Sequence, residues 1–323
     1  MSGTRTFVLL IADPEDSEAA LVEDALLRNS ASVTWIDTAD FPERIGMIAT
    51  PDLSHPGWLE MDGQLIDLGA VTAVYRRSPG VFGMDDAMSG PERRFALMEA
   101  VQGVGGVLTN LQCTWVNHPA RVADATYKPL QISVARQCGL PVPATLVTNV
   151  GEAARSFIAS VGDRVIYKPM SPGIVAEQGR VKVLNATIVT KDLIDDVSVG
   201  KTAHTFQKFI EKRYDARVTV IGSVFFGVAI DAGTSDAFVD WRADYDALDY
   251  RVIDVPVDVR AGILAYLDRL GLSFTALDFS VDRAGKWWFL EANPNGLWAW
   301  LEERVSIPVS DAIARYLINE ERI

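Results

Sequence analysis

Two apolar segments near the end of the chain, Phe274–Asp282 and Trp287–Glu291, are separated by a short turn. Each has the length and composition of a β-strand, so the pair predicts an antiparallel hairpin. The first strand carries Asp278, and the second ends in Glu291-x-Asn293. This hairpin constrains the fold strongly, because it brings three oxygen-bearing side chains together on neighbouring strands.

These three side chains suit a magnesium ion. Mg²⁺ prefers hard oxygen ligands in octahedral geometry and usually shares them with nucleotide phosphates. Asn293 supplies an oxygen without adding a negative charge beside those phosphates. We interpret Asp278, Glu291 and Asn293 as a magnesium site, with ordinary polar residues at strand ends as the alternative.

The remaining chain predicts an α/β and α+β architecture in three units. A strand–helix–strand opening over Thr6–Asp37 is typical of a parallel sheet. A second unit starts near His118 with one amphipathic helix expected over Asp124–Cys138, and a third, rich in strands, starts near His204. The expected domains are an N-terminal α/β domain over 1–118, a central domain over 119–203 and a C-terminal domain over 204–323.

Composition excludes some classes of partner. The 323 residues hold 30 Lys and Arg against 43 Asp and Glu, a net charge of −13, which argues against nucleic acid and anionic membranes as partners. Cys113 and Cys138 are the only cysteines, so neither a disulfide framework nor a metal–thiolate site is expected. The N-terminus does not resemble a signal peptide, and no apolar run approaches the ~18 residues of a membrane span. We expect a cytoplasmic protein.

Two lysines are candidate phosphate contacts. Lys128 lies on the expected helix of the second unit, and Lys168 ends a strand in VIYKP. The loop Ser171–Gly179 follows and could close over phosphates, because backbone N–H groups in such loops bind anions. The alternative is that both are solvated surface lysines.

The segment Gln207–Gly222 suggests the rest of a nucleotide site. Backbone groups of Lys208–Ile210 could meet an adenine edge between the apolar side chains of Phe209 and Ile210, and Asp215 could accept from ribose hydroxyls. Arg217 and Arg242 are candidates for contacts with a phosphate or acyl phosphate, since a guanidinium matches that geometry. A surface salt-bridge cluster is the alternative.

A nucleophile–base pair and a glycine-rich dinucleotide fingerprint are both absent from the sequence. Cations and magnesium ligands without a covalent nucleophile fit phosphoryl transfer by positioning and charge neutralisation.

Taken in order, these motifs resemble the ATP-grasp superfamily over the last two thirds of the chain. The resemblance implies two lobes that grip Mg-ATP, and an ATP-dependent ligase that activates a carboxylate. It implies phosphate contacts for Lys128 and Lys168, a nucleotide-binding hinge at Gln207, Lys208, Phe209 and Ile210, a ribose contact for Asp215, and magnesium ligation by Asp278, Glu291 and Asn293. Arg217, Arg242 and Lys168 are then the candidate catalytic residues.

A narrower resemblance covers almost the whole chain. AVYRRSPG, TWVNHP, GLPVPATLVTN, VIYKP, VDWR and FLEANPNG are similar to segments of the graspetide synthetases, the microviridin-type peptide maturases. That resemblance implies a ribosomal precursor peptide with a leader and a core rich in acids and hydroxyls. Its Asp or Glu side chains would be joined to Ser/Thr hydroxyls or Lys amines as macrocyclic esters or amides. One departure is that the loop after Lys168 is not rich in glycine. We also expect a homodimer.

A leader contact is also predicted. Asp192, Asp195 and Asp196 in Lys191–Gly200 could share one helix face and pair with a basic leader residue, with a solvated acidic helix as the alternative. Two other functions stay open: an ATP-grasp ligase for free amino acids or small peptides, and a non-catalytic nucleotide-binding regulator.

Overall fold

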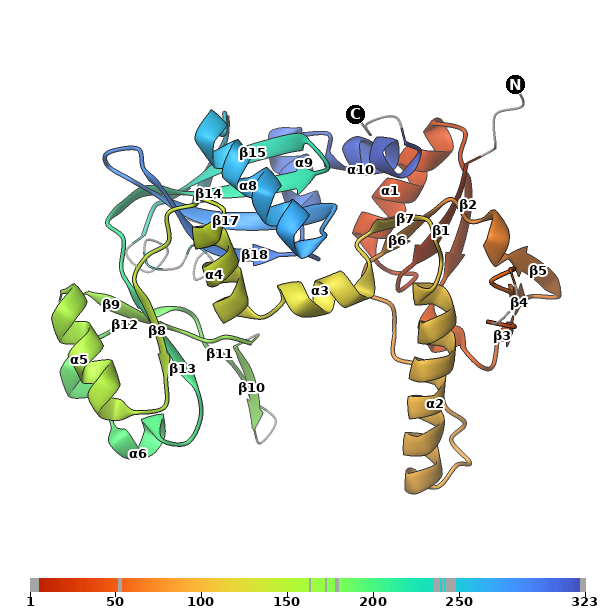
Figure 1. Cartoon of the computed structure of the whole chain (residues 1–323), viewed down its shortest axis with the longest axis horizontal. Helices are drawn as coiled ribbons and strands as arrows, with labels where there is room; N and C mark the ends of the chain where they lie inside the picture. Colours follow the sequence, from red (N-terminus) through yellow and green to blue (C-terminus); the bar gives the residue numbers. More distant parts are fainter. Residues whose placement is uncertain are drawn as a thin grey trace.

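The computed structural model describes residues 6–51, 54–162, 164–171, 173–177, 180–234, 239, 241 and 248–319. Three main sheets follow one another along the chain, one N-terminal, one central and one C-terminal (Figure 1). Among these residues, no helix is both long and apolar enough to cross a membrane.

The N-terminal sheet is parallel, in the order β2-β1-β6-β7. Alternation along β1 fills two cores: Val8 and Leu10 face α1, whereas Leu9 and Ile11 face α2 and a small antiparallel sheet. The elements are β1 (Phe7–Ile11), α1 (Ser17–Arg28), β2 (Ser32–Ile36), η1 (Thr38–Asp40), β3 (Ile45–Ile48), β4 (Trp58–Met61), β5 (Gln64–Asp67), η2 (Leu68–Ala70), β6 (Ala73–Arg76), α2 (Gly90–Thr109) and β7 (Thr114–Val116).

Helix α2 projects away from this sheet (Figure 1). A capping box between Ser89 and Glu92 fixes its start. The helix continues past the pair Gly105-Gly106 and ends at Thr109. Val104 and Leu108 hold that last turn in the core, and their burial outweighs the helix-weakening glycines.

The central sheet has the order β12-β9-β13-β8 and is antiparallel in each pair. Helix α5 covers it, with Ala154 and Ile158 packed on Val165 and Phe206. The elements are α3 (Pro119–Ala125), α4 (Lys128–Gln137), β8 (Thr145–Thr148), α5 (Gly151–Val161), β9 (Val165–Lys168), β10 (Ile174–Glu177), β11 (Arg180–Val183), β12 (Thr187–Val189), η3 (Lys191–Leu193), α6 (Asp196–Val199) and β13 (His204–Lys208).

The C-terminal sheet is antiparallel in the order β16-β15-β14-β17-β18. One face packs on α4 and α8, and this core includes Val218, Phe279 and Ile263. The other face looks toward the central sheet. The elements are β14 (Lys212–Ile221), β15 (Val224–Ala232), β16 (Leu248–Ile253), α8 (Val257–Leu270), β17 (Phe274–Asp282), β18 (Trp287–Asn293), α9 (Ala299–Val305) and α10 (Val309–Leu317).

The end of the chain returns to its beginning. Helix α10 packs along α1, and Ile313 and Leu317 share a core with Val22 and Leu26 (Figure 1). Asn117, just after β7, donates to the carbonyls of Phe274 and Pro294 and accepts from the N–H groups of Ser273 and Phe274. The N-terminal sheet is therefore bonded directly to the two ends of the hairpin.

Two predictions of local structure are wrong. The helix expected over Asp124–Cys138 is two helices, because the chain breaks at Thr126-Tyr127 and α4 restarts with a proline in its first turn. The stretch Lys191–Gly200 is not one helix either, since η3 and α6 are separate and Asp195 caps α6. The three acids therefore do not share one helix face.

The division into three domains stays a proposal. The sheets support three units, and the proposed boundary at 203/204 falls just before β13, which pairs with β8 and β9 of the central sheet. The return of α10 to α1 means that the first and last units share one hydrophobic core.

Candidate active site

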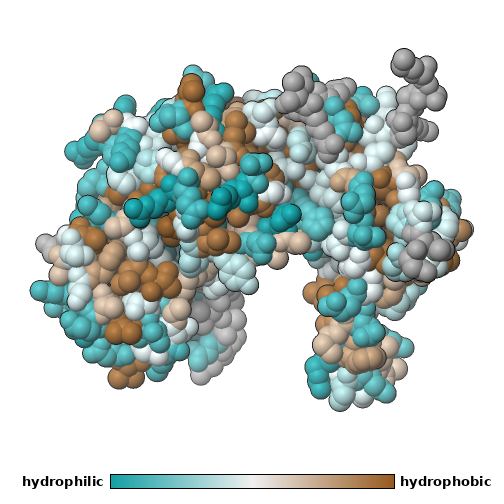
Figure 2. Space-filling model, in the orientation of Figure 1, coloured by the Kyte–Doolittle hydropathy of each residue, from teal (hydrophilic) through white to brown (hydrophobic). Residues whose placement is uncertain are grey.

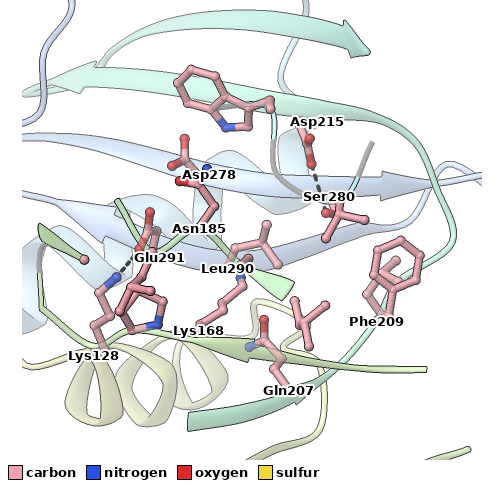
Figure 3. A pocket seen from close by; sticks show the side chains of 18 of the residues that line it. Lys128, Lys168, Asn185, Gln207, Phe209, Asp215, Asp278, Ser280, Leu290 and Glu291 are labelled. Carbon is pink, nitrogen blue, oxygen red and sulfur yellow. Dashed lines mark hydrogen bonds and ion pairs between the residues drawn. The ribbon is translucent and has the colours of Figure 1, made fainter. Parts of the chain in front are cut away.

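A cavity lies between the central sheet and the free face of the C-terminal sheet (Figure 3). Charged side chains gather at one end, where Lys128, Glu291 and Asp278 are seen, and Phe209 lies at the other. Lys168, Gln207 and Leu290 lie between them. The cavity thus joins a charged end to an apolar end, as a nucleotide requires.

The charged end is built by strand register. Arg217 on β14 stands opposite Asp278 on β17, and Asp278 stands opposite Glu291 on β18. Arg217 Nη1 donates to Asp278 Oδ1 at 2.8 Å, and both side chains are almost fully buried. Asn293 lies two residues beyond Glu291, opposite Ala276. Neighbouring strands therefore place the predicted magnesium ligands in one patch.

A β-bulge makes this patch possible. The register between β17 and β18 shifts after Asp278, so that Phe279 pairs with Phe289 and Leu290 is the extra residue. Before the bulge, Phe289 faces the core; after it, Ala292 does. Because of this shift Leu290 and Glu291 both line the cavity. Simple alternation would have turned Glu291 toward the core.

A second register shift, on β14, also brings an additional side chain onto the cavity face. The register shifts between Lys212 and Tyr214, which brings Lys212 onto the face that carries Asp215. Lys212 Nζ and Asp215 Oδ2 form a buried ion pair at 2.5 Å, and Ser280 Oγ donates to Asp215 Oδ1 at 3.0 Å. Burial raises the pKa of Asp215, and Lys212 opposes that rise. Both oxygens of the predicted ribose acceptor thus have partners within the protein.

Lys128 reaches the patch because α4 begins at that residue. Its Nζ lies 2.6 Å from Glu291 Oε2. Gln131, one turn further, donates to the carbonyls of Ala125 and Ala292 and accepts from Ala292 N–H. Gln131 is buried and bonds α4 to β18, so it fixes Lys128 beside Glu291.

The central sheet supplies the opposite wall. Lys168 ends β9 and is half-buried, opposite Thr205 of β13. Gln207 is buried, and its Nε2 donates to Thr145 Oγ1 while its Oε1 has no partner among the described residues. A buried acceptor without a partner suits the amino group of adenine. Phe209 is buried beneath the guanidinium of Arg164.

Only some backbone groups of the expected hinge, Lys208–Ile210, are available to bind adenine. Lys208 N–H donates to Ala144 O and Phe209 N–H to Arg164 O. Any adenine contact of Lys208–Ile210 therefore falls to the other backbone groups of that segment. The side chain of Lys208 is exposed, and Ile210 is half-buried at the cavity wall.

The donor set at the charged end fits magnesium. No group of three or more His, Cys, Asp or Glu side chains in the described part of the chain is arranged to hold a metal ion. The patch instead offers two carboxylates and the exposed amide of Asn293. That set matches an ion that retains waters and takes its remaining ligands from phosphates.

Two residues from the first part of the chain, Arg77 and Glu18, hold the loop after Asn293. Arg77 is buried, donates to Asn295 O at 3.1 Å and forms an ion pair with Glu18. Glu18 in turn accepts from the N–H groups of Trp298 and Ala299, and burial raises its pKa. A shared ionic cluster therefore anchors both ends of the loop that follows the magnesium patch.

A second cavity adjoins the first and shares Lys128, Ser171, Trp241 and Glu291 with it. Arg217 lines the second cavity, where its Nη2 also donates to Leu297 O at 3.2 Å. Three aromatic side chains, Tyr127, Tyr250 and Trp300, also line this cavity. A substrate in this cavity would meet the phosphate end of the nucleotide cavity.

The structure brings most predicted site residues together. Around the first cavity lie Lys128, Lys168, Gln207, Lys208, Phe209, Ile210, Asp215, Asp278 and Glu291, with Arg217 and Asn293 around the second. Arg242 lies outside the described residues. Asp192, Asp195 and Asp196 line neither cavity; Asp195 bonds to Ser198, and Asp196 pairs with Arg155.

Sequence reasoning missed Lys212, Ser280, Gln131 and Leu290. The two bulges hide Lys212 and Leu290, because alternation counted from Asp215 and from Glu291 puts these two side chains on the wrong face. The available clue to Lys212 was its position only three residues before Asp215.

Solved structures of similar proteins cover nearly the whole chain. Macrocyclase MdnC from Microcystis aeruginosa MRC, bound with precursor peptide MdnA, has 27% identity and a TM-score of 0.84, covering 97% of this chain and 100% of its own. ATP-grasp ligase PsnB, complexed with a phosphomimetic variant of a minimal precursor, Mg and ADP, has 25% identity and a TM-score of 0.79, covering 98% and 99%.

A third structure, the Chryseobacterium gregarium RiPP-associated ATP-grasp ligase with ADP and a leader and core peptide, has a TM-score of 0.89. It is 24% identical and covers 98% of this chain and 97% of its own, a likeness that shows the fold alone. No protein-family model matches the sequence, and no curated protein does so either.

The fold and the two-walled cavity define an ATP-grasp ligase, an ATP-dependent enzyme. Within that class the chain resembles macrocyclases and ligases of ribosomally made peptides, and the resemblance to the graspetide synthetases expected from the sequence is confirmed.

Proposed function

We propose that this enzyme phosphorylates Asp or Glu side chains of a ribosomal precursor peptide and joins them to Ser/Thr hydroxyls or Lys amines, forming macrocyclic esters or amides. The observation that carries the proposal is the junction of the two cavities at Lys128 and Glu291. A peptide carboxylate in the second cavity meets the γ-phosphate of ATP in the first. MdnC and PsnB, whose structures hold precursors, support a peptide as the substrate.

The reaction has two steps. A carboxylate oxygen of the peptide attacks the γ-phosphorus, the bond to the β–γ bridging oxygen breaks, and ADP leaves with that oxygen. A hydroxyl or amine of the same peptide then attacks the acyl carbon. Phosphate leaves with the former carboxylate oxygen, and the nucleophile loses its proton. The net change is the loss of one water from the peptide for each ATP converted to ADP and phosphate.

The position of each site residue in the two cavities suggests its role in the reaction. Lys168 and Lys128 would neutralise phosphate charge, and Lys128 would leave Glu291 to do so. Asp278, Glu291 and Asn293 would hold Mg²⁺, which neutralises phosphate oxygens when bound. Arg217, in the second cavity, would stabilise the acyl phosphate, with Arg242 proposed for the same task. Gln207, the Lys208–Ile210 segment and Asp215 would bind the nucleoside.

The finer partner assignments belong to this proposal. We infer a precursor with a leader and a core rich in acids and hydroxyls, and a homodimer in the cytoplasm, where Cys113 and Cys138 would be reduced thiols. Sedimentation of the purified protein tests the dimer; a single species of 35.3 kDa would contradict it.

The test is incubation with Mg-ATP and a Thr-, Glu- and Asp-rich peptide encoded beside this gene. Mass spectrometry should show one water lost per link, with an equal yield of ADP. ADP release only with free amino acids would favour the small-molecule ligase. Nucleotide binding without any turnover would favour the regulator.

A further inference from the structure

The outer part of the second cavity carries a cation that the proposed reaction does not use. Arg304 lies on α9 at the cavity wall, and its Cζ stands 5.2 Å from the ring centre of Tyr250. Within the part of the chain that the structure describes, Arg304 forms no ion pair. The other two cations of this cavity, Lys128 and Arg217, are paired with Glu291 and Asp278.

The aromatic wall holds this arginine in place. Tyr250 meets Trp300 edge to face at 5.4 Å, and Trp300 stacks on Trp241 at 5.7 Å. Trp241 also lines the nucleotide cavity, so the aromatic row runs from Arg304 toward the reaction centre. An aromatic face orients a guanidinium while leaving its N–H edge available to a carboxylate.

Part of the apolar lining of the second cavity is exposed. Leu297 and Tyr127 line the same cavity and have exposed fractions of 61% and 66%. Exposed apolar side chains in the same cavity as an arginine without an acidic partner fit a ligand that combines apolar groups with negative charge. A nucleotide is accounted for by the first cavity, so the ligand here is the second substrate.

We propose that Arg304, set against Tyr250, is a carboxylate subsite for the peptide substrate, and that it binds an acidic side chain other than the one being phosphorylated. This inference rests on the proposed peptide-ligase function. A peptide with several acids would thus be held at two points: one carboxylate near Arg217 and another at Arg304. Arg304 would set which acid reaches the phosphate.

Steady-state kinetics of Arg304→Ala, Arg304→Lys and the neighbouring exposed control Glu303→Ala test the inference. Loss of a charge-assisted contact should raise KM for the peptide about tenfold or more, because such contacts are the strong ones. KM for ATP should stay within about twofold, and Arg304→Lys should recover part of the loss. An unchanged peptide KM in Arg304→Ala, with the wild type active, overturns the inference and leaves the proposed function standing.

A second measurement identifies the partner group. Peptides with single Asp→Asn or Glu→Gln changes at each acid are compared in the wild type and in Arg304→Ala. One change should raise KM in the wild type and have no further effect in the variant, as expected for two groups in contact. Equal penalties in both enzymes for each change would contradict the subsite. A wild type that links no peptide would refute the proposed function itself.

Discussion

The two walls of the nucleotide cavity are built in different ways. On the C-terminal sheet, Asp215, Arg217 and Asp278 are at most 5% exposed, and each is already paired with an opposite charge. On the central sheet, Lys168 is half-buried and Lys208 exposed, above a smaller core. The C-terminal wall therefore holds its charged side chains in fixed positions before ATP binds. The central wall carries its lysines on a sheet that has a smaller hydrophobic core.

The difference follows from the cost of burying charge. Buried ions are tolerated only when they are paired, and a pair fixes the position of both groups. A magnesium site needs that precision, because the ion demands near-ideal octahedral geometry. Phosphate contacts by lysine are less demanding, since an ammonium is a rotatable point charge. We infer that the C-terminal wall sets the geometry and the central wall completes it.

The largest expected effect comes from the metal patch. Asn293→Ala should abolish product formation, a fall of at least about 100-fold, because even residues behind metal ligands cost 10–100-fold when removed. Stability should hardly change, since Asn293 is exposed. Turnover and thermal unfolding measure both. Asn295→Ala is the matched control, because its bond to Arg77 uses the backbone carbonyl; equal losses in the two variants would refute the assignment.

The pairing on the C-terminal wall gives the next effect. Arg217→Met leaves Asp278 buried without its cation, which should cost about 3–5 kcal/mol of unfolding free energy. Adding Asp278→Leu should recover most of that stability while the enzyme stays inactive. Urea unfolding of the two variants and of Asp278→Leu alone measures the coupling. If the losses of unfolding free energy in the two single variants simply add in the double variant, the Arg217–Asp278 pair does not organise this wall.

The central wall should respond in activity alone. Lys168→Ala should raise KM for ATP about 10–100-fold, the range expected for losing a charge-assisted contact. Its melting temperature should stay close to that of the wild type. Lys182→Ala, an exposed lysine of β11, is the control. If Lys168→Ala lost as much unfolding free energy as Arg217→Met, the proposed difference between the two walls would be wrong.

The smallest effect concerns the hairpin turn. Asp282 accepts from Trp288 Nε1, Ala284 N–H and Lys286 N–H, and the Trp288 bond above all lowers its pKa below 3.8. The Asp282 carboxylate therefore stabilises the folded state fully above the ordinary pKa of 3.8. This contribution is lost as the pH falls through the lowered pKa of the folded state. Asp282→Ala should cost about 1 kcal/mol at pH 7.

Urea unfolding between pH 7 and pH 3 should show the wild type and Asp282→Ala converging at the acidic end. Turnover at pH 7 should be unchanged, since Asp282 lines neither cavity. A difference in stability that is independent of pH would contradict the role of the carboxylate.

Much of this fold could be predicted from local sequence. The hairpin Phe274–Glu291, the helix Val257–Leu270 and the closing helix Val309–Leu317 show clear periodicity, and the structure contains all of them. Strand β16 and helix α9 were missed. The end of helix α2 is not evident from local sequence, because the core burial that carries it past Gly105-Gly106 is a tertiary effect.

The sequence could predict which residues form the site. It could not predict how their side chains are arranged. Asp278, Glu291 and Lys128 could be chosen by type and order, and the structure places them at one end of the cavity. Their pairing depends on the bulge at Leu290 and on the break before Lys128, which arise from strand register and helix docking. The anchoring of the loop by Glu18 and Arg77 joins residues some 220 to 280 positions apart, beyond any local pattern.

The most direct test of the account follows oxygen from the substrate carboxylate. The precursor peptide is made with oxygen-18 in its Asp and Glu side chains and incubated with the enzyme and Mg-ATP. Activation by phosphorylation predicts that each link transfers one labelled oxygen to inorganic phosphate, with ADP as the other product. Links that form while the phosphate stays unlabelled, or with AMP in place of ADP, would contradict the carboxylate-phosphorylating mechanism.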